Sequence, residues 1–312
     1  MFRRLDARTG TVRWETNVRG KAEKYFFHGD MFVTDDRVVA SSDVDAASGA
    51  EAGIHAFDRE SGRELWKYPA GRGVLGAVTG DARRVFAHRS NGDVAAVDLE
   101  SGRAVWTLPL KAPAWESAAV AGSLVFVGST EGQVHALDVG TGTRSWQRGL
   151  GAPVSTSIRA LDSDVYVGTA DGTLHRLDAR TGEVRGSLKL DSTLTPTSLP
   201  TGSSGELLVL LADQKADYRA VVAVDRALSR IIWRQAATDR WSTSRVFVWH
   251  RAVWTGTPDG HVTAYCAADG ARAWSTKLFT AAIRSIGGSA DLLYVGTPQG
   301  TLYAVRAQVS CP

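Results

Sequence analysis

The chain has 312 residues, of which 44% are hydrophobic and 22% are charged, values typical of a folded globular protein. With 36 Lys and Arg against 33 Asp and Glu, its net charge of +3 is too small to indicate a nucleic-acid partner. Two cysteines are too few for a cysteine-rich zinc module or a disulfide framework, and no stretch is apolar for long enough to cross a membrane.

The first predicted element, a strand over residues 11–16, completes the first copy of a repeat. The repeat reads Asp-x-x-Ser/Thr-Gly-x-x-x-Trp, as in the segment from Asp58 to Trp66. Its last position recurs at intervals of 52, 40, 40, 40, 47 and 41 residues, and a period near 40 is typical of propeller blades or helical arrays. The seven copies end at Trp14, Trp66, Trp106, Trp146, Gly186, Trp233 and Trp274.

The residues between the copies favour strands over helices. Residues 164–178 contain two short runs rich in Val, Leu and Tyr, separated by Asp171-Gly172. Such runs predict strands, and Asp-Gly between them predicts a hairpin turn. The same layout recurs at residues 124–138, 253–266 and 292–306, so each repeat predicts four short antiparallel strands, a to d.

Counting the strands predicts an all-β, seven-bladed propeller of four-stranded antiparallel blades. The chain begins with a strand d and ends with an a-b-c set over residues 285–306. We expect the N-terminal strand d to join the C-terminal set, which closes the ring and removes its open edges. Residues 1–312 then form a single domain, with residues 2–6 left over as a surplus c-like strand.

Each repeated residue has a predicted structural role. The Asp carboxylate accepts backbone hydrogen bonds in the turn between strands c and d, and the Gly supplies a positive φ at its end. The Trp lies on strand d, where its ring packs against the next blade. This structural role is expected for Trp14, Trp66, Trp106, Trp146, Trp233 and Trp274.

The repeat, followed by strand pairs that end in Val-Gly-Thr/Ser-x-Asp-Gly, resembles the PQQ-like propeller repeat over essentially the whole chain. That family includes quinoprotein alcohol dehydrogenases, outer-membrane assembly lipoproteins and sensor domains of bacterial Ser/Thr kinases. The dehydrogenases have eight blades, a vicinal Cys-Cys pair and Ca²⁺ ligands, whereas Cys266 and Cys311 are far apart. The resemblance therefore implies the fold without a PQQ cofactor, and no other cofactor is predicted. The lipobox signal of the lipoproteins is also missing.

Positions where the repeats differ are the candidates for function. On a propeller, the d–a and b–c loops share one face, and the b–c loops at residues 41–53 and 213–219 are extended. Large or charged residues replace small ones at the start of several a strands. They predict a ligand-binding site on this face, or alternatively a plug of packed side chains and ion pairs in the channel. These residues are Tyr25, Trp115, Glu116, Trp241, Arg245 and Arg284.

Sequence motifs for catalysis are weak. His55, His135 and His175 occupy equivalent places on strand c, which indicates a structural position, and no metal site is predicted. Cys266 replaces the turn Asp and Cys311 follows the last strand; free thiols are predicted, with a disulfide as the alternative.

The predicted function is a non-catalytic propeller that binds a protein, a peptide or a small ligand on its d–a/b–c face. Its most concrete version is the sensor domain of a larger bacterial protein such as a Ser/Thr kinase. The alternative is a cofactor-independent lyase, hydrolase or cyclase with Glu116, His88 and Arg284 as acid–base and anion-binding residues. No nucleic-acid partner and no membrane insertion are predicted, and the chain is expected to be a monomer. The first residues carry no apolar signal segment, so the chain as written is expected in the cytoplasm, or outside it if excised from a longer protein.

Overall fold

The structure is a computed structural model, and its regular elements are β-strands. No helix in the described part of the chain is long and apolar enough to span a membrane. The described residues are 2–16, 25–26, 30–44, 52–71, 73–74, 76–89, 91–110, 117–190, 193–194, 207–213, 219–236, 246–278, 280, 282–289 and 291–312.

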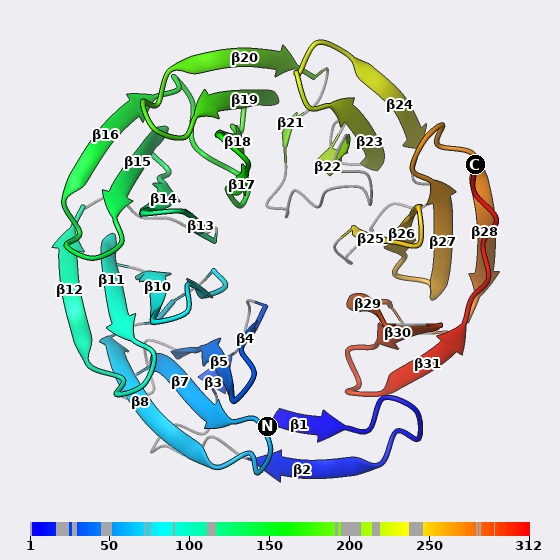
Figure 1. Ribbon diagram of the computed structural model, residues 1–312. Coiled ribbons are helices and arrows are strands. Elements are labelled where there is room, and N and C mark those ends of the chain that lie inside the picture. The colour runs from blue at the N-terminus through cyan, green and yellow to red at the C-terminus, as the bar shows by residue number, and fades with distance from the viewer. Residues whose placement is uncertain are drawn as a thin grey trace. The chain divides into compact units, whose positions relative to one another are not determined.

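The chain divides into two compact units, Met1–Val165 with Asp178–Glu183 and Tyr166–Leu177 with Val184–Pro312. Figure 1 labels the strands of both. The first unit contains three antiparallel four-stranded sheets and two short antiparallel pairs, β1–β2 and β3–β6. Its strands are β1 (Phe2–Leu5), β2 (Val12–Thr16), β3 (Tyr25–Phe26), β4 (Phe32–Val33), β5 (Arg37–Ser41), β6 (Asp43–Val44), β7 (Ala52–Asp58), β8 (Glu64–Gly71), β9 (Thr79–Gly80), β10 (Arg84–His88), β11 (Asp93–Asp98), β12 (Ala104–Pro109), β13 (Ala119–Ala121), β14 (Leu124–Gly128), β15 (Gln133–Asp138) and β16 (Arg144–Gly149).

The division between the units falls within the next four-stranded sheet, β17–β20. The second unit continues with two further four-stranded sheets and the three-stranded sheet β29–β31. The strands are β17 (Arg159–Leu161), β18 (Asp164–Gly168), β19 (Thr173–Asp178), β20 (Val184–Lys189), β21 (Thr193–Leu194), β22 (Leu207–Asp213), β23 (Arg219–Asp225), β24 (Ile231–Ala236), β25 (Phe247–Trp249), β26 (Ala252–Gly256), β27 (His261–Cys266), β28 (Arg272–Lys277), β29 (Ser285–Ser289), β30 (Leu292–Gly296) and β31 (Leu302–Arg306).

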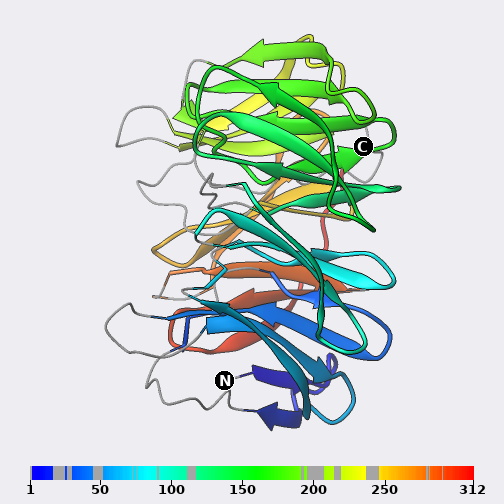
Figure 2. The same ribbon diagram turned by 90° about the vertical axis from the view of Figure 1, so that its left-hand side faces the viewer.

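Burial follows the position of each strand in its sheet. The inner strands β10, β11, β14 and β15 are mostly buried along their length, whereas the outer strands β12 and β16 alternate exposed and half-buried residues. In the first unit the sheets β9–β12 and β13–β16 lie face to face (Figures 1 and 2), and Phe86, Val94, Val127 and Leu137 share one apolar cluster. An inner strand is covered on both faces, so most of its central positions are apolar. This arrangement confirms the predicted all-β propeller of four-stranded antiparallel blades.

The predicted number of blades is wrong. Six four-stranded blades are present in the described part of the chain, not seven. The expected seventh blade required β2 to join β29–β31, but β2 instead pairs with β1, with Trp14 opposite Arg4. The surplus N-terminal strand therefore takes the partner that closure of the ring required, and β29–β31 has three strands.

The turns between strands c and d form as the repeat predicts. In the turn after β11, Asp98 Oδ1 accepts hydrogen bonds from the backbone nitrogen of Ser101 at 2.8 Å and from its hydroxyl at 2.6 Å. Gly102 follows with a φ of 69°. These hydrogen bonds lower the pKa of Asp98, because they stabilise its ionised form. The predicted capping role of the repeated Asp is confirmed.

Candidate functional site

Two segments of the predicted binding face lie side by side. Tyr25 in β3 pairs with Val44 in β6, and Phe26 pairs with Asp43. Residues 25–26 precede the first a strand, while residues 43–44 belong to the extended b–c loop. A d–a segment and a b–c segment of the same blade are thus joined through their backbones, which gives this part of the face a defined structure.

Most of the predicted ligand-binding residues fall outside the described residues: Trp115, Glu116, Trp241 and Arg245, and the side chain of Tyr25. Arg284 is described and exposed, immediately before β29. Its backbone nitrogen donates a hydrogen bond to the carbonyl of Gly296 at 2.9 Å, so the backbone that carries this side chain is fixed. The proposed grouping of these side chains stays a prediction.

Two serine hydroxyls, one before β13 and one at the end of β5, connect neighbouring sheets of the first unit. The Ser117 hydroxyl accepts a hydrogen bond from the backbone nitrogen of Ala77 at 2.9 Å. The Ser41 hydroxyl donates to the carbonyl of Gly76 at 3.0 Å. These bonds link residues about one repeat apart and give the loops of this unit a rigid base.

Five of the repeated tryptophans link their sheet to a turn of the following sheet. Trp66 on β8 donates its Nε1 hydrogen to the carbonyl of Leu99, 33 residues later, at 3.0 Å. Its ring lies against the turn glycine of the next blade, so that a Cβ on Gly102 would come within 2.6 Å of the indole. The equivalent donor and acceptor pairs are Trp14 and Arg59, Trp106 and Val139, Trp146 and Ala179, and Trp233 and Ala267.

One seam of the second unit lacks this contact on both sides. Gly186 occupies the tryptophan position of β20, and in the next turn Leu228 has a φ of 56° where other blades have glycine. A Cβ on Gly186 would lie 3.0 Å from the carbonyl oxygen of Ala227. Since the indole is missing, the glycine that would make room for it is not required.

His88, the candidate acid–base residue, is buried at the end of β10 with 5% of its surface exposed. His135 on β15 is also buried, at 4%, and neither of its ring nitrogens has a hydrogen-bond partner. Burial, and then the charges of Arg144 and His88, lower the pKa of His135 to about 4. The two histidines belong to the packing between blades, and the described residues contain no cluster of three metal-binding side chains.

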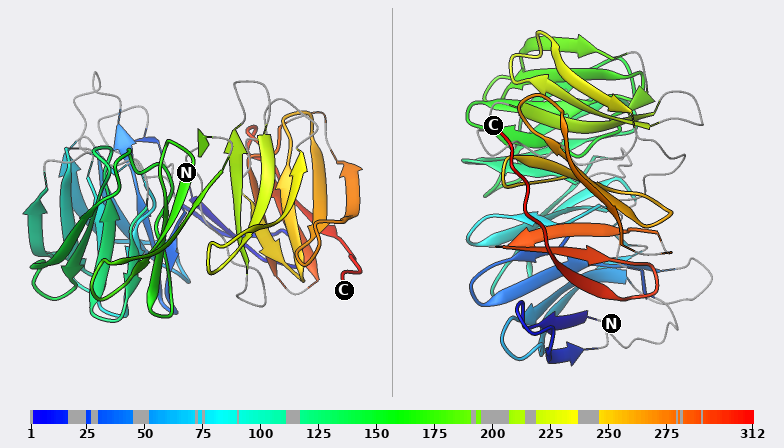
Figure 3. Two further views of the ribbon diagram at one scale, coloured as in Figure 1. Left: turned by 90° about the horizontal axis from the view of Figure 1, so that it is seen from above. Right: turned by 90° about the vertical axis from the view of Figure 1, so that its right-hand side faces the viewer.

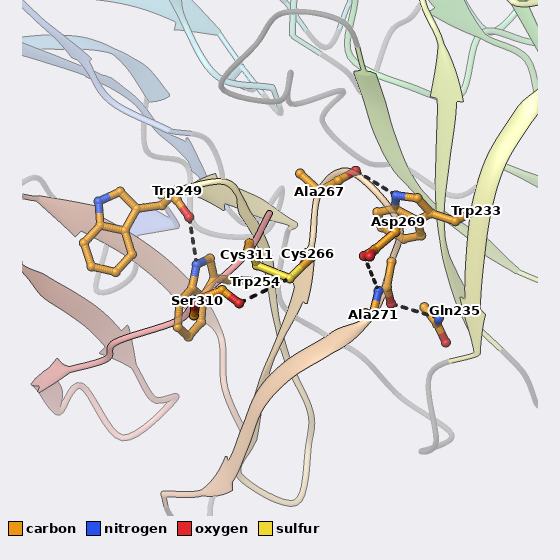
Figure 4. Close-up of a disulfide and its surroundings, with 11 residues drawn as sticks. Trp233, Gln235, Trp249, Trp254, Cys266, Ala267, Asp269, Ala271, Ser310 and Cys311 are labelled. Atoms are coloured by element: carbon orange, nitrogen blue, oxygen red, sulfur yellow. Dashed lines mark hydrogen bonds between the residues drawn. A yellow bond between two sulfur atoms is a disulfide. The ribbon is translucent and has the colours of Figure 1, made fainter.

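The cysteines form a disulfide, so the prediction of free thiols is wrong. Cys266 and Cys311 are bonded, with their Cα atoms 5.3 Å apart and a sequence separation of 45. Figure 4 shows the bond at the turn after β27, and Figure 3 shows the C-terminal segment running from β31 back across β25–β28. Cys266 stands where other turns carry the capping Asp. The missing Asp is the sequence signal for this bond, but the path of the C-terminal segment is visible only in the fold.

A pocket of about 730 Å³ lies beside the disulfide in the second unit. Trp249 supplies an aromatic wall, and Arg251 and Arg306 bring two guanidinium groups against one carboxylate, Asp291. Arg306 and Asp291 are 3.7 Å apart and both are largely exposed, so their ion pair is weak. With two guanidinium groups and one carboxylate, the lining can accept an anionic group. The sequence analysis missed this pocket, because its residues come from a hairpin turn and the C-terminal segment, which are far apart in the sequence.

The sequence matches a family model over most of its length. The model is described as outer membrane protein assembly factor BamB, and it matches residues 2–109, 90–216 and 187–309. The chain belongs to this family of PQQ-like propeller repeats. The family resemblance expected from the repeat is thereby confirmed. A search of curated protein sequences found no match.

Solved structures similar to this PQQ-like chain share its fold at low sequence identity. BamB from Moraxella catarrhalis is 19% identical with a TM-score of 0.72, over 95% of this chain and 86% of that one. The computationally designed Ika8 protein is 13% identical with a TM-score of 0.57, over 92% and 98%. Quinohemoprotein alcohol dehydrogenase ADHIIG from Pseudomonas putida HK5 is 12% identical with a TM-score of 0.57, over 87% and 69%. An assembly factor, a designed protein and an enzyme share the fold, so the fold does not specify the activity.

Proposed function

We propose that this chain is a protein-binding propeller that presents its d–a and b–c loops to a partner protein. The observation that carries the proposal is the pairing of β3 with β6, which joins a d–a segment to the extended b–c loop. Loops held by a rigid scaffold are the usual place for recognition. The family name, an outer membrane protein assembly factor, supports a protein as the partner rather than a small ligand.

We also propose that the chain works outside the cytoplasm. The Cys266–Cys311 disulfide supports this location, because disulfides persist in oxidising compartments and are kept reduced in most cytosols. Source cells are quenched with acid, and their denatured protein is treated with a thiol-reactive polyethylene glycol, with and without prior reduction. We expect a shift in mobility only after reduction. A shift without reduction would show free thiols in the cell and contradict the proposed location.

Site-specific photo-crosslinking tests the binding face. A photoreactive phenylalanine analogue is placed at Tyr25 or at Arg284 and, as the control, at Val184, an exposed residue of the outer strand β20. In source cells we expect one discrete protein adduct from positions 25 and 284 and none from position 184. Equal labelling from all three positions would contradict a dedicated face. If the face served a sensor that binds a small ligand, no protein adduct would form.

A further inference from the structure

The hydroxyl of Ser187 lies beside a histidine ring on strands c and d of the sheet β17–β20. Ser187 on β20 pairs with His175 on β19, and its Oγ is 3.0 Å from Nδ1 of the ring. The serine is exposed and the histidine is half-buried. Both residues belong to the second unit. A hydroxyl within hydrogen-bond distance of an imidazole is the first requirement of an activated serine nucleophile.

Hydrogen bonds at the far side of the ring determine which nitrogen of His175 carries the proton. The Thr169 hydroxyl lies 2.6 Å from Oδ1 of Asp171 and 3.1 Å from the carbonyl oxygen of Thr173. A carboxylate and a carbonyl only accept hydrogen bonds, so the Thr169 hydroxyl donates its hydrogen to one of them. Its oxygen therefore accepts from Nε2 of His175, 3.3 Å away. In the neutral ring Nδ1 is then unprotonated, and it accepts the hydroxyl hydrogen of Ser187.

The charge states that this order requires are the ones the surroundings favour. The carboxylate of Asp171 accepts hydrogen bonds from the Thr169 hydroxyl, from the ammonium of Lys189 at 3.0 Å and from the hydroxyl of Thr173 at 3.0 Å. The bond from Thr169 above all holds the pKa of Asp171 well below its ordinary range. Burial lowers the pKa of His175, so its ring is neutral at pH 7 and can take up a proton.

The sheet β25–β28 repeats this arrangement with one member replaced. Thr257 donates its hydroxyl hydrogen to Asp259, and Ser275 is exposed on β28, at the same sequence spacing as the threonine, aspartate and serine of β17–β20. Thr263 stands at the position of the histidine, and its hydroxyl is 3.1 Å from that of Ser275. A threonine hydroxyl cannot act as a base at neutral pH, so Ser275 is a natural control for the effect of the imidazole.

Two other histidines on strand c lack an accessible serine. His135 on β15 pairs with Gln147 on β16. Nε2 of His55 lies 3.1 Å from the hydroxyl of Ser42, but Ser42 is fully buried, so an electrophile cannot reach it. Ser187 therefore combines a neighbouring imidazole with exposure to solvent.

We propose that Ser187 is a nucleophile that becomes acylated by activated esters of small carboxylic acids. Its Oγ attacks the carbonyl carbon of the ester while the hydroxyl proton passes to Nδ1 of His175. The bond from that carbon to the leaving oxygen then breaks, and the leaving group takes the proton from His175. The products are an ester on Ser187 and a free alcohol. Thr169 and Asp171 are positioning residues, because they hold the ring with Nδ1 towards the serine.

Acetylation by p-nitrophenyl acetate tests the proposal. The full chain is incubated with the ester near neutral pH, and the acetylated residues are identified and timed by mass spectrometry of its peptides. We expect Ser187 to be acetylated about a hundredfold faster than Ser275 in the same sample. The comparison is made within one folded protein and depends on no variant. The site lies on strand d, not on the d–a and b–c loops of the proposed function, so either proposal can fail alone.

Two variants test the role of the imidazole. His175→Gln should slow the acetylation of Ser187 to the rate of Ser275, while Ser275 in the same protein keeps its own rate and reports an intact fold. Thr263→His places an imidazole beside Ser275 and should speed its acetylation about tenfold or more. Equal rates at Ser187 and Ser275 in the wild type, an unchanged rate at Ser187 in His175→Gln, or no gain at Ser275 in folded Thr263→His would each overturn the proposal.

Discussion

The indole of Trp66 lies against Gly102 of the next blade, and a Cβ on that glycine would come within 2.6 Å of the ring. The same indole donates its Nε1 hydrogen to the carbonyl of Leu99 at 3.0 Å. One residue of strand d therefore contacts the following turn through both packing and a hydrogen bond, and the turn must leave room for the ring. Gly102 is required for two separate reasons, its positive φ and its lack of a side chain.

Gly102→Ala should destabilise the protein more than Gly10→Ala. Both glycines have a φ near 70°, at 69° and 71°, so both substitutions strain the backbone, by about 1 kcal/mol. A Cβ at Gly10 meets no atom within 4 Å, whereas at Gly102 it overlaps the ring of Trp66. We expect an additional loss of about 2 kcal/mol at Gly102, measured by urea denaturation. Equal losses would mean that the indole moves aside without cost.

Trp106→Ala should lower the free energy of unfolding by about 3 kcal/mol, because the ring loses its packing across the seam. Trp106→Phe keeps an aromatic ring but cannot donate to the carbonyl of Val139, 3.1 Å away, and should cost about 1 kcal/mol. Chemical denaturation of the two variants separates packing from hydrogen bonding. A larger loss for Phe than for Ala would contradict this division.

Reduction of the disulfide should destabilise the second unit. Cys266 and Cys311 close a loop with a sequence separation of 45, which is expected to contribute about 3–4 kcal/mol. We expect reductant to lower the melting temperature of the wild type and to leave a Cys266→Ala, Cys311→Ala double variant unchanged. If the double variant melts at the same temperature as the oxidised wild type, the bond does not stabilise the fold.

Acid should weaken the packing between β9–β12 and β13–β16. The pKa of His135 is about 4 in the folded chain, below its ordinary value of 6.5, so the unfolded chain binds a proton more readily. Above pH 6.5 His135 is neutral in both states and the protein keeps its full free energy of unfolding. As the pH falls towards 4, this free energy decreases by up to about 3 kcal/mol. Unfolding curves of the wild type and His135→Leu between pH 7 and pH 4 measure this loss. The variant should lose less stability than the wild type over this range, and parallel curves would contradict the assignment.

The repeat predicted the strands well because its signals are local. Asp98 and Gly102 act within one turn, so their sequence spacing is sufficient to locate it. The number of blades depended instead on the partner of Trp14. Residues 2–5 are joined to β2 by a short turn, and closing a short loop costs less entropy than bringing the two ends of the chain together. Residues 2–5 and the strand β31 both resemble strand c. The sequence pattern alone therefore does not show which of the two pairs with β2.

The candidate site was harder to predict for the same reason. Repeats identify the positions that vary, such as Arg284, but not which varying positions meet in space. The disulfide illustrates the limit, since Cys266 was recognised as a departure from the repeat while its partner depended on the path of the last residues.

The disulfide also determines how the molecule would respond to mechanical load. When the chain is pulled by its first and last residues, force entering at Pro312 passes through the sulfur bridge from Cys311 to Cys266. The segment between these cysteines, which includes β28, β29, β30 and β31, then bears no tension and cannot extend. Stretching would extend only the residues before Cys266. Once a reductant breaks the disulfide, the residues between the two cysteines could extend as well.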